Sequence, residues 1–229
     1  MLLTAGLLLG AARPAEAQVI GFRNINAPIP DGDATGLVDV RTVAGPAAPI
    51  LDVNVSLVLN GLGEGGFNGD LYVGLQHEAG YAVLLNRVGR RGGSLSGYAD
   101  SGFSLTLDDE AVAGDVHAYR LTLAGSHAAP LDGPLTGSWA PDARNADPDF
   151  VLDSSLRGAG LEVFRGASAA GSWVLFVADL ETGGQMRLDA WSLEVRAVPE
   201  PGGVAVLAAL SLLGLVGRRF ASRAWGSVR

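Results

Sequence analysis

The segment that decides the fold runs from residue 171 to residue 179 and reads GSWVLFVAD. Between Trp173 and Val177 it consists of aromatic, β-branched and aliphatic residues, which is typical of a β-strand. Apolar side chains occupy both alternating positions, so we expect a central strand that is covered on both faces. A Gly-Gly pair at 183–184 marks a turn, and residues 186–195 supply a closing strand.

Alternation of apolar and polar residues predicts further strands earlier in the chain. The clearest case is 51–59, in which every odd-numbered residue is Leu or Val. The same pattern occurs in three shorter segments, 71–75, 103–107 and 119–123. Glycine-rich turns separate these strands, at 61–69, 89–97 and 182–184.

The body of the chain shows no sustained helical spacing, and its many glycines and prolines argue against helices. Short strands joined by turns are typical of a β-sandwich. Residues 126–153 are rich in Pro, Asp and Gly and are expected to form a long loop over one sheet. We therefore predict an all-β, antiparallel β-sandwich over residues 18–197.

The composition excludes some classes of partner. Residues 18–200 hold 11 arginines against 23 acidic residues, a net charge near −12, and the chain has no lysine. Such a surface repels nucleic acid and anionic lipid, whereas it suits solubility and divalent cations. Cysteine is also absent, so disulfides, a cysteine nucleophile and thiolate metal sites are excluded.

Residues 1–17 are expected to be a signal peptide that forms an apolar helix. Five leucines supply the apolar core (Leu2, Leu3, Leu7, Leu8 and Leu9). Ala15-Glu16-Ala17 is a small-x-small cleavage site. No basic residue precedes Arg13, so the usual positive region is missing and an upstream start is one explanation. A buried first helix is the alternative.

Residues 198–229 contain a three-part tail. Pro199-Glu200-Pro201 leads into an apolar run, with a helix predicted over 203–217, and the tail ends in a basic segment that begins with Arg218 and Arg219. The run is shorter than the roughly 20 apolar residues of a straight membrane span. The arginines are expected to stay cytoplasmic, which leaves the body of the protein outside.

This tail resembles the PEP-CTERM sorting signal of Gram-negative bacteria, including its Pro-Glu-Pro. The resemblance implies transient anchoring in the inner membrane, recognition by an exosortase and removal of the tail. It further implies delivery to the cell envelope, the outer surface or the extracellular matrix. An ordinary tail anchor is the alternative.

The body contains Gly69-Asp70-Leu71, then Gly-x-Trp-x-Leu-x-Val-x-Asp at 171–179 and Trp-x-Leu at 191–193. This order resembles the P domain, also called P/Homo B, of kexin-like and furin-like proprotein convertases. The histidine that often precedes the Gly-Asp-Leu of the family is missing, because 61–67 contains none. The resemblance implies a jelly-roll-like sandwich that accompanies a serine-type endopeptidase and does not itself carry the catalytic triad.

Two carboxylate clusters are candidate metal sites. They are Asp31 with Asp33, and Asp108-Asp109-Glu110. Carboxylate oxygens suit Ca²⁺, although neither cluster has the spacing of a calcium loop. The alternative is that both are acidic turns without a ligand. Asp179, at a strand end before the Gly-Gly turn, is expected to accept backbone N–H groups and close that turn.

Catalysis is not predicted. The chain has three histidines, His77, His117 and His127, and no Gly-x-Ser-x-Gly nucleophile motif. One tryptophan and three tyrosines form a candidate platform for sugar stacking, with ordinary core and edge positions as the alternative (Trp139, Tyr72, Tyr81 and Tyr98).

These observations predict an exported, non-catalytic interaction module. Its expected partners are the exosortase that processes it and a matrix polysaccharide or another surface protein. The alternative function is that of an accessory domain that stabilises a subtilisin-like protease.

Overall fold

The computed structural model describes residues 17–198, apart from 45–47 and 64. The predicted signal peptide up to residue 16 and the sorting signal from Pro199 onward, with its helix over 203–217, lie outside this range. Within the described range, no helix has the length and apolar character needed to cross a membrane.

The described residues form ten strands, three 3₁₀ helices and one short α-helix. The strands are β1 (Ala17–Phe22), β2 (Ala27–Pro28), β3 (Asp33–Val43), β4 (Ile50–Leu62), β5 (Leu71–His77), β6 (Gly80–Asn86), β7 (Phe103–Leu107), β8 (Leu135–Trp139), β9 (Gly171–Asp179) and β10 (Gln185–Ala197). The helices are η1 (Asn68–Asp70), η2 (Val116–Ala118), α1 (Tyr119–Ala124) and η3 (Leu161–Phe164).

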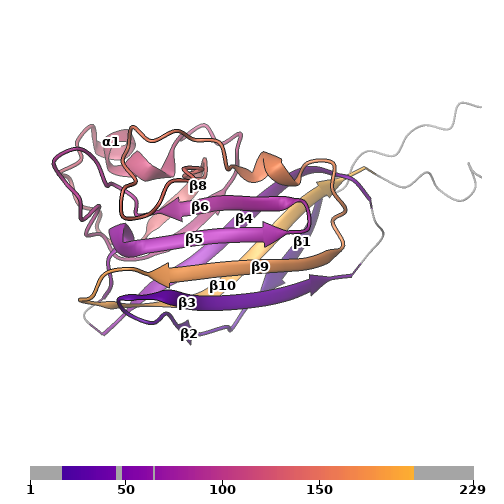
Figure 1. Cartoon of the computed structure of the whole chain (residues 1–229), viewed down its shortest axis with the longest axis horizontal. Coiled ribbons are helices and arrows are strands. Elements are labelled where there is room, and N and C mark those ends of the chain that lie inside the picture. Colours follow the sequence, from indigo (N-terminus) through magenta and orange to yellow (C-terminus); the bar gives the residue numbers. More distant parts are fainter. Residues whose placement is uncertain (1–16, 45–47, 64, 199–229) are drawn as a thin grey trace, which may run out of the picture. The chain divides into compact units, whose positions relative to one another are not determined.

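The strands are arranged in two sheets that face each other (Figure 1). One sheet has the order β3-β9-β5-β6, and the other has the order β1-β10-β4-β7-β8, with β2 beside β10. The prediction of an all-β sandwich is confirmed. Not every pair is antiparallel, however, because β7 and β8 run parallel, with Phe103 opposite Leu135.

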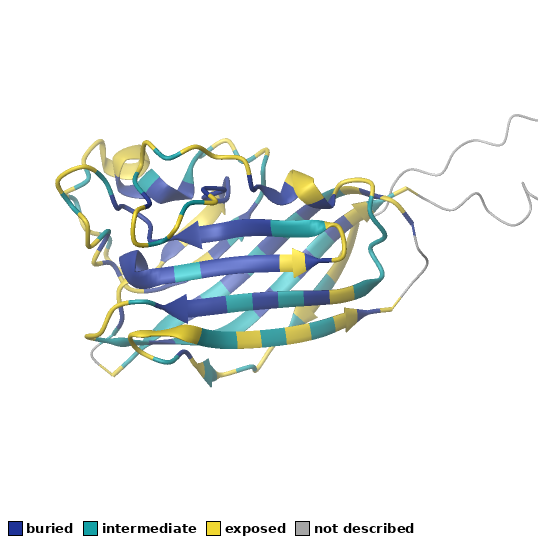
Figure 2. Cartoon of the chain, in the orientation of Figure 1, coloured by how far each residue is buried: buried dark blue, intermediate teal, exposed yellow. Residues whose placement is uncertain are grey.

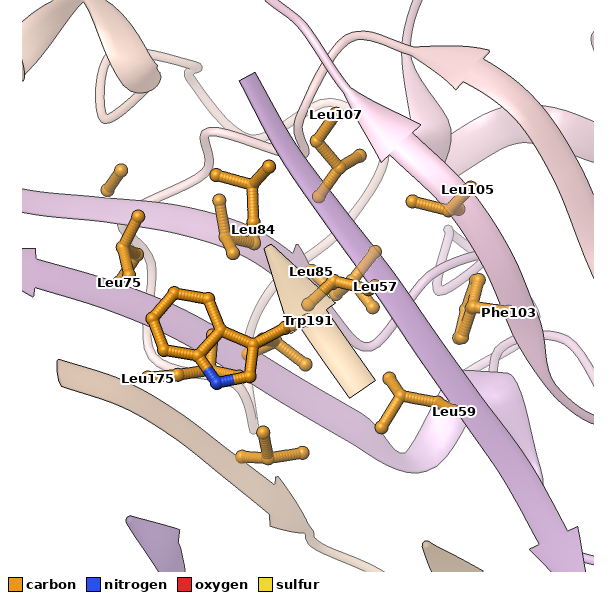
Figure 3. Packing of buried hydrophobic residues seen from close by; sticks show 14 of the residues in the cluster. Leu57, Leu59, Leu75, Leu84, Leu85, Phe103, Leu105, Leu107, Leu175 and Trp191 are labelled. Atoms are coloured by element: carbon orange, nitrogen blue, oxygen red, sulfur yellow. The ribbon is translucent and has the colours of Figure 1, made fainter. Parts of the chain in front are cut away.

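The core fills the space between the two sheets, and Figure 3 shows aliphatic side chains of both sheets around Trp191. On β4 the alternating residues from Val53 to Leu59 are buried, as the sequence pattern predicts. Trp173 and Trp191 are buried, and both indole N–H groups are satisfied. Trp173 donates to the Ala169 carbonyl oxygen at 3.1 Å, and Trp191 donates to Asp39 at 2.6 Å. Such large side chains dominate the burial of a small core.

Strand β9 is central in its sheet, as predicted, with β3 on one side and β5 on the other. The expectation that it is covered on both faces is wrong. Trp173, Leu175 and Val177 are fully buried, but Val174 and Phe176 on the opposite face are only half-buried. Figure 2 shows this alternation along β9. The outer face of the sheet therefore carries partly covered apolar side chains at β9, whereas both faces of β6 are buried.

The strand predicted over 119–123 is wrong, because these residues belong to α1. Asp115 caps the 3₁₀ turn that precedes it by accepting the His117 N–H at 2.9 Å. Gly125, with φ of 66°, ends the helix in the left-handed conformation. Tyr119 is buried whereas Leu121 and Leu123 are exposed, so the apparent period-two pattern did not mark a core face.

The loop predicted over 126–153 contains one strand, β8. It adds to the edge of the second sheet by pairing with β7 over five residues. Leu135 and Trp139 are buried at its two ends, and Gly137 between them has φ of 95°. The short length of β8 and its three exposed central residues explain why its strand pattern is weak.

Candidate functional site

A pocket of about 660 Å³ lies where η1, the loop after β6 and the β9–β10 turn come together. Its lining combines charged, aromatic and small residues: Phe67, Asp70, Arg87, Arg90, Leu95, Ser96, Gly97, Tyr98, Ala99, Asp149, Glu181 and Thr182. The residues come from four separate parts of the chain, so the pocket exists only in the folded domain.

Main-chain hydrogen bonds hold the pocket wall against η1. Gly69 donates to the Tyr98 carbonyl oxygen at 2.9 Å, and Tyr98 donates to the Val88 carbonyl oxygen at 3.0 Å. Gly97 has φ of 72°, and a Cβ added there would lie 2.6 Å from the Val88 oxygen. Only glycine fits this position without a shift of the backbone.

Two guanidinium groups form the charged part of the pocket. Arg87 is 2.7 Å from Glu181 and 3.8 Å from both Asp70 and Asp149. Arg90 donates from Nη2 to the Asp149 carbonyl oxygen at 2.7 Å, while its buried Nε has no partner. Burial, and then the charge of Arg87, lower the pKa of Arg90.

Aromatic and apolar side chains form another part of the lining. Phe67 and Leu95 are 39% and 62% exposed, so both are available to a ligand. Tyr98 is buried, and its hydroxyl lies 2.6 Å from Nδ1 of His127. Burial raises the pKa of Tyr98 to about 12. A mixture of planar polar groups with aromatic and apolar surface is suited to reversible binding.

Next to the pocket lies a pair of buried carboxyl groups, Asp70 and Asp179. Burial raises the pKa of Asp70 to about 6, although the charge of Arg87 opposes the shift. Burial, followed by the charges of Asp70 and Asp31, raises the pKa of Asp179 to about 7. Neither oxygen of Asp179 has a hydrogen-bond partner. The main-chain N–H of Glu181, in the β9–β10 turn, opposes this rise of the pKa, so the expected role of Asp179 at the turn stays a prediction.

The first predicted metal cluster, Asp31 with Asp33, lies at the start of β3. Asp33 accepts the N–H and the hydroxyl of Thr35, at 2.9 and 2.8 Å. These bonds lower the pKa of Asp33. Asp31 accepts a long hydrogen bond of 3.4 Å from the Gly183 N–H, in the β9–β10 turn. Asp33 thus closes its own turn, and Asp31 faces the neighbouring one.

The second predicted cluster is divided among different partners. Asp108 accepts the Glu110 N–H at 2.8 Å, and Glu110 forms an exposed ion pair with Arg165 at 3.0 Å. Asp109 accepts the N–H groups of Leu161 and Glu162, at 3.1 and 2.6 Å. Burial and the neighbouring Glu162 carboxyl raise the pKa of Asp109 to about 6. Within the described residues, no three acidic or histidine side chains converge as a metal site. Calcium binding at either cluster stays a prediction.

The buried His117 and Asp142 have the base and orienter arrangement of a catalytic triad, but their geometry serves a structural role. His117 Nδ1 lies 2.6 Å from Asp142, and its Nε2 lies 2.8 Å from the Arg90 carbonyl oxygen. Both ring nitrogens are thus engaged, and neither faces a hydroxyl that it would activate. Arg144 completes the group, at 3.1 Å from Asp142 and 2.7 Å from Asp115.

The other histidines also have partners within the fold. His77 is stacked on Trp173, with ring centroids 4.1 Å apart. Its two nitrogens lie 2.9 and 2.8 Å from the carbonyl oxygens of Ser172 and Ser168. His127 contacts the hydroxyl of Tyr98, as described above. The contacts of His77 tie β5 to the residues at the start of β9, and that of His127 joins two loops.

The predicted aromatic platform is wrong. Trp139 is buried and donates to the Thr136 carbonyl oxygen at 2.8 Å, while Tyr81 donates to the hydroxyl of Tyr72 at 3.0 Å. Only Tyr98 of this set lines the pocket. The ordinary core and edge positions, which were the alternative, describe these side chains better.

The sequence analysis did not single out Arg87 or Arg90, and it named Asp70 and Asp179 only in separate motifs, not as a pair. One signal was available, because Asp70 directly precedes β5 and Asp179 ends β9. Antiparallel pairing places the start of one strand beside the end of its neighbour. That rule would have brought the two aspartates together.

No protein-family model matches the chain, and no curated protein matches it. Among solved structures, a serine protease of Aeromonas sobria in complex with the chaperone ORF2 matches with 17% identity and a TM-score of 0.40. The serine protease of Aeromonas sobria alone matches with 17% identity and a TM-score of 0.39. The matches cover 85% and 84% of this chain, and the chain spans 28% of each matched chain.

Proposed function

We propose that this chain is an exported, non-catalytic interaction module of the P-domain type, which binds a matrix polysaccharide through the pocket. The observation that carries the proposal is the pocket lining, which combines Arg87, Arg90 and three acidic residues with the exposed Phe67 and Leu95. Guanidinium groups donate hydrogen bonds to sugar hydroxyls, and carboxylates accept hydrogen bonds from them. An aromatic face packs against the apolar side of a sugar ring.

The non-catalytic part of the proposal has its own support in the contacts of the histidines. The two ring nitrogens of His117 contact Asp142 and a main-chain carbonyl oxygen. His77 faces two main-chain carbonyls, and His127 faces a buried tyrosine. A hydrolase of the triad type needs a histidine with one nitrogen directed at a nucleophile.

Binding is tested with the purified full chain on an array of bacterial polysaccharides. Leu95→Ala and Phe67→Ala remove exposed apolar surface from the pocket, and each is expected to weaken the interaction at least about tenfold. Leu156→Ala is the matched control, because Leu156 is 91% exposed and does not line the pocket. Retained affinity in both pocket variants, or no polysaccharide ligand at all, would contradict the proposal.

Export and sorting are proposed from the terminal sequences. The module is expected to reach the cell envelope or matrix of a Gram-negative bacterium, after an exosortase removes the tail at Pro199-Glu200-Pro201. The test follows the mass of the protein in cells with and without an exosortase. A Glu200→Ala variant is expected to keep its tail, and equal processing of both proteins would refute sorting by this signal.

The competing function, taken from the sequence resemblance, is an accessory domain for a subtilisin-like protease. The discriminating experiment mixes the full chain with such a protease encoded nearby and measures the midpoint of thermal inactivation. A raised midpoint, together with no polysaccharide binding, would favour the accessory function over the one proposed.

A further inference from the structure

Asp179 is an exception among the buried carboxylates of this fold. It is fully buried, and neither of its oxygens has a partner at full hydrogen-bond geometry. The main-chain N–H of Glu181 is a nearby donor, and it only partly offsets the effect of burial. Asp100, which is also buried, accepts bonds from Tyr119, from the main chain of Leu131 and from two nitrogens of Arg120, all between 2.6 and 2.8 Å. A buried carboxylate without partners is costly, so something outside the described contacts is expected to meet it.

The pairing of the strands places a second acidic residue next to Asp179. Asp179 lies opposite Leu71 of β5 on one side and opposite Asp33 of β3 on the other. Asp70 directly precedes Leu71, and its carbonyl oxygen accepts the Leu180 N–H at 2.9 Å. The two buried aspartates therefore lie at the same end of the sheet, where β5 begins and β9 ends.

The arginines of the region neutralise this pair only in part. Arg87 makes its short contact with Glu181, at 2.7 Å, and is 3.8 Å from Asp70. Arg90 donates to the main chain at Asp149. The region holds two guanidinium groups against five carboxyl groups, which are those of Asp31, Asp70, Asp149, Asp179 and Glu181. The region around Asp179 therefore carries more negative than positive charge.

We propose that a divalent cation of the Ca²⁺ class binds between Asp70 and Asp179, at the junction of β5 and β9. The free oxygens of Asp179 supply hard ligands, and a cation supplies the missing charge. Since no third acidic or histidine side chain converges there within the described range, main-chain carbonyls and water complete the shell. Asp70 also lines the pocket, so the cation fixes one wall of it.

The proposal is tested by thermal unfolding of the full chain, with excess chelator or with millimolar CaCl₂ at matched ionic strength and neutral pH. Calcium is expected to raise the unfolding midpoint by about 5 °C, because a ligand that binds only the folded state stabilises it. An unchanged midpoint would overturn the proposal. That result is expected if Asp70 and Asp179 share a proton instead of binding a cation.

Variants locate the cation. Asp179→Asn is nearly isosteric, so in chelator its midpoint is expected to equal or exceed that of the wild type, and its response to calcium is expected to be lost. Asp70→Asn is the second variant and is expected to lose the response as well. If both variants kept the full response, the cation would lie elsewhere and the proposal would fail.

Three matched controls separate this site from other acidic groups. Asp149→Asn removes a pocket carboxylate whose side chain is 77% exposed, and it is expected to keep the calcium response. Asp33→Asn and Asp109→Asn remove residues of the two clusters predicted from sequence and are expected to keep it too. Loss of the response in either of these, with retention in Asp179→Asn, would assign the cation to that cluster. Polysaccharide binding is a separate measurement and does not decide this result.

Discussion

The space between the two sheets and the loop layer, which consists of the loops that connect β6 to β9 (87–102, 108–134 and 140–170), are both largely buried, but different contacts hold them. Between the sheets, Trp173 and Trp191 pack among aliphatic side chains, and only their indole N–H groups need partners. The loop layer also buries charged groups, as in the His117–Asp142 pair and the Arg120–Asp100 pair.

The difference teaches where each region is vulnerable. Apolar packing loses stability gradually with the volume that is removed. A buried charged network fails when one member is lost, because its partner is left as an uncompensated charge. The sheets can therefore accept conservative changes of shape, whereas the loop layer depends on the identity of each charged residue.

The largest expected effect is in the core. Trp173→Ala is expected to lower the free energy of unfolding by about 4 kcal/mol, because it removes a buried indole and leaves a cavity. Urea denaturation measures the change. Val38→Ala on β3 is the control, since Val38 is 53% exposed, and its effect is expected to stay within about 0.5 kcal/mol. Similar losses in both variants would mean that the sheets are not held by the tryptophan core.

The second expected effect tests the charged network. Asp142→Asn leaves His117 and Arg144 without their buried anion and is expected to cost about 3 kcal/mol. Asp132→Asn removes an exposed carboxylate and serves as the control in the same urea titration. A loss below about 1 kcal/mol for Asp142→Asn would show that the network is not the support of the loop layer.

The third prediction concerns pH. The pKa of His117 is raised. Burial, the largest single cause, and the charge of Arg144 both lower it. The hydrogen bond and charge of Asp142, together with the hydrogen bond to the Arg90 carbonyl oxygen, outweigh them. The stabilisation by the imidazolium is therefore complete below the ordinary histidine pKa of about 6.5 and is lost as pH rises through the raised value.

A pH series of urea midpoints checks this sign in wild type and His117→Gln. Asp70 and Asp179, whose pKa values are also raised, favour the folded state at low pH in the same way, so only the difference between the two proteins reports on His117. That difference is expected to shrink as pH rises. A difference that is constant with pH would refute a protonated His117.

The smallest expected effect is at the surface. The Glu110–Arg165 pair has both side chains more than half exposed, so Glu110→Gln is expected to change the free energy of unfolding by less than about 0.5 kcal/mol. High salt should abolish even this difference. A larger loss would mean that the acidic cluster at 108–110 has a role beyond an exposed ion pair.

The sheets were largely predictable from sequence because alternation reports which face of a strand is buried, as Val53 to Leu59 illustrate. The errors have local causes. Tyr119, Leu121 and Leu123 imitate a strand although only Tyr119 contacts the core. Strand β8 is short and exposed in the middle, so its parallel pairing with β7 depends on tertiary context.

The pocket was not predictable because its residues are distant in sequence. Arg87 and Glu181 are 94 positions apart, yet they form the short ion pair of the pocket. The two predicted metal clusters were chosen because their acids are adjacent in sequence, which is typical of turns. Asp70 and Asp179 come together only through the pairing of β5 with β9.

The length and direction of β10 determine how far the pocket lies from the C-terminal end of the domain. The strand begins beside the β9–β10 turn that lines the pocket and runs 13 residues to Ala197. There β1 pairs with it, with Ala17 opposite Arg196. At about 3.3 Å per residue, β10 is about 40 Å long. The pocket and the C-terminal end of β10 are therefore separated by the full length of this strand, so an attachment at Ala197 would leave the pocket end of the domain free.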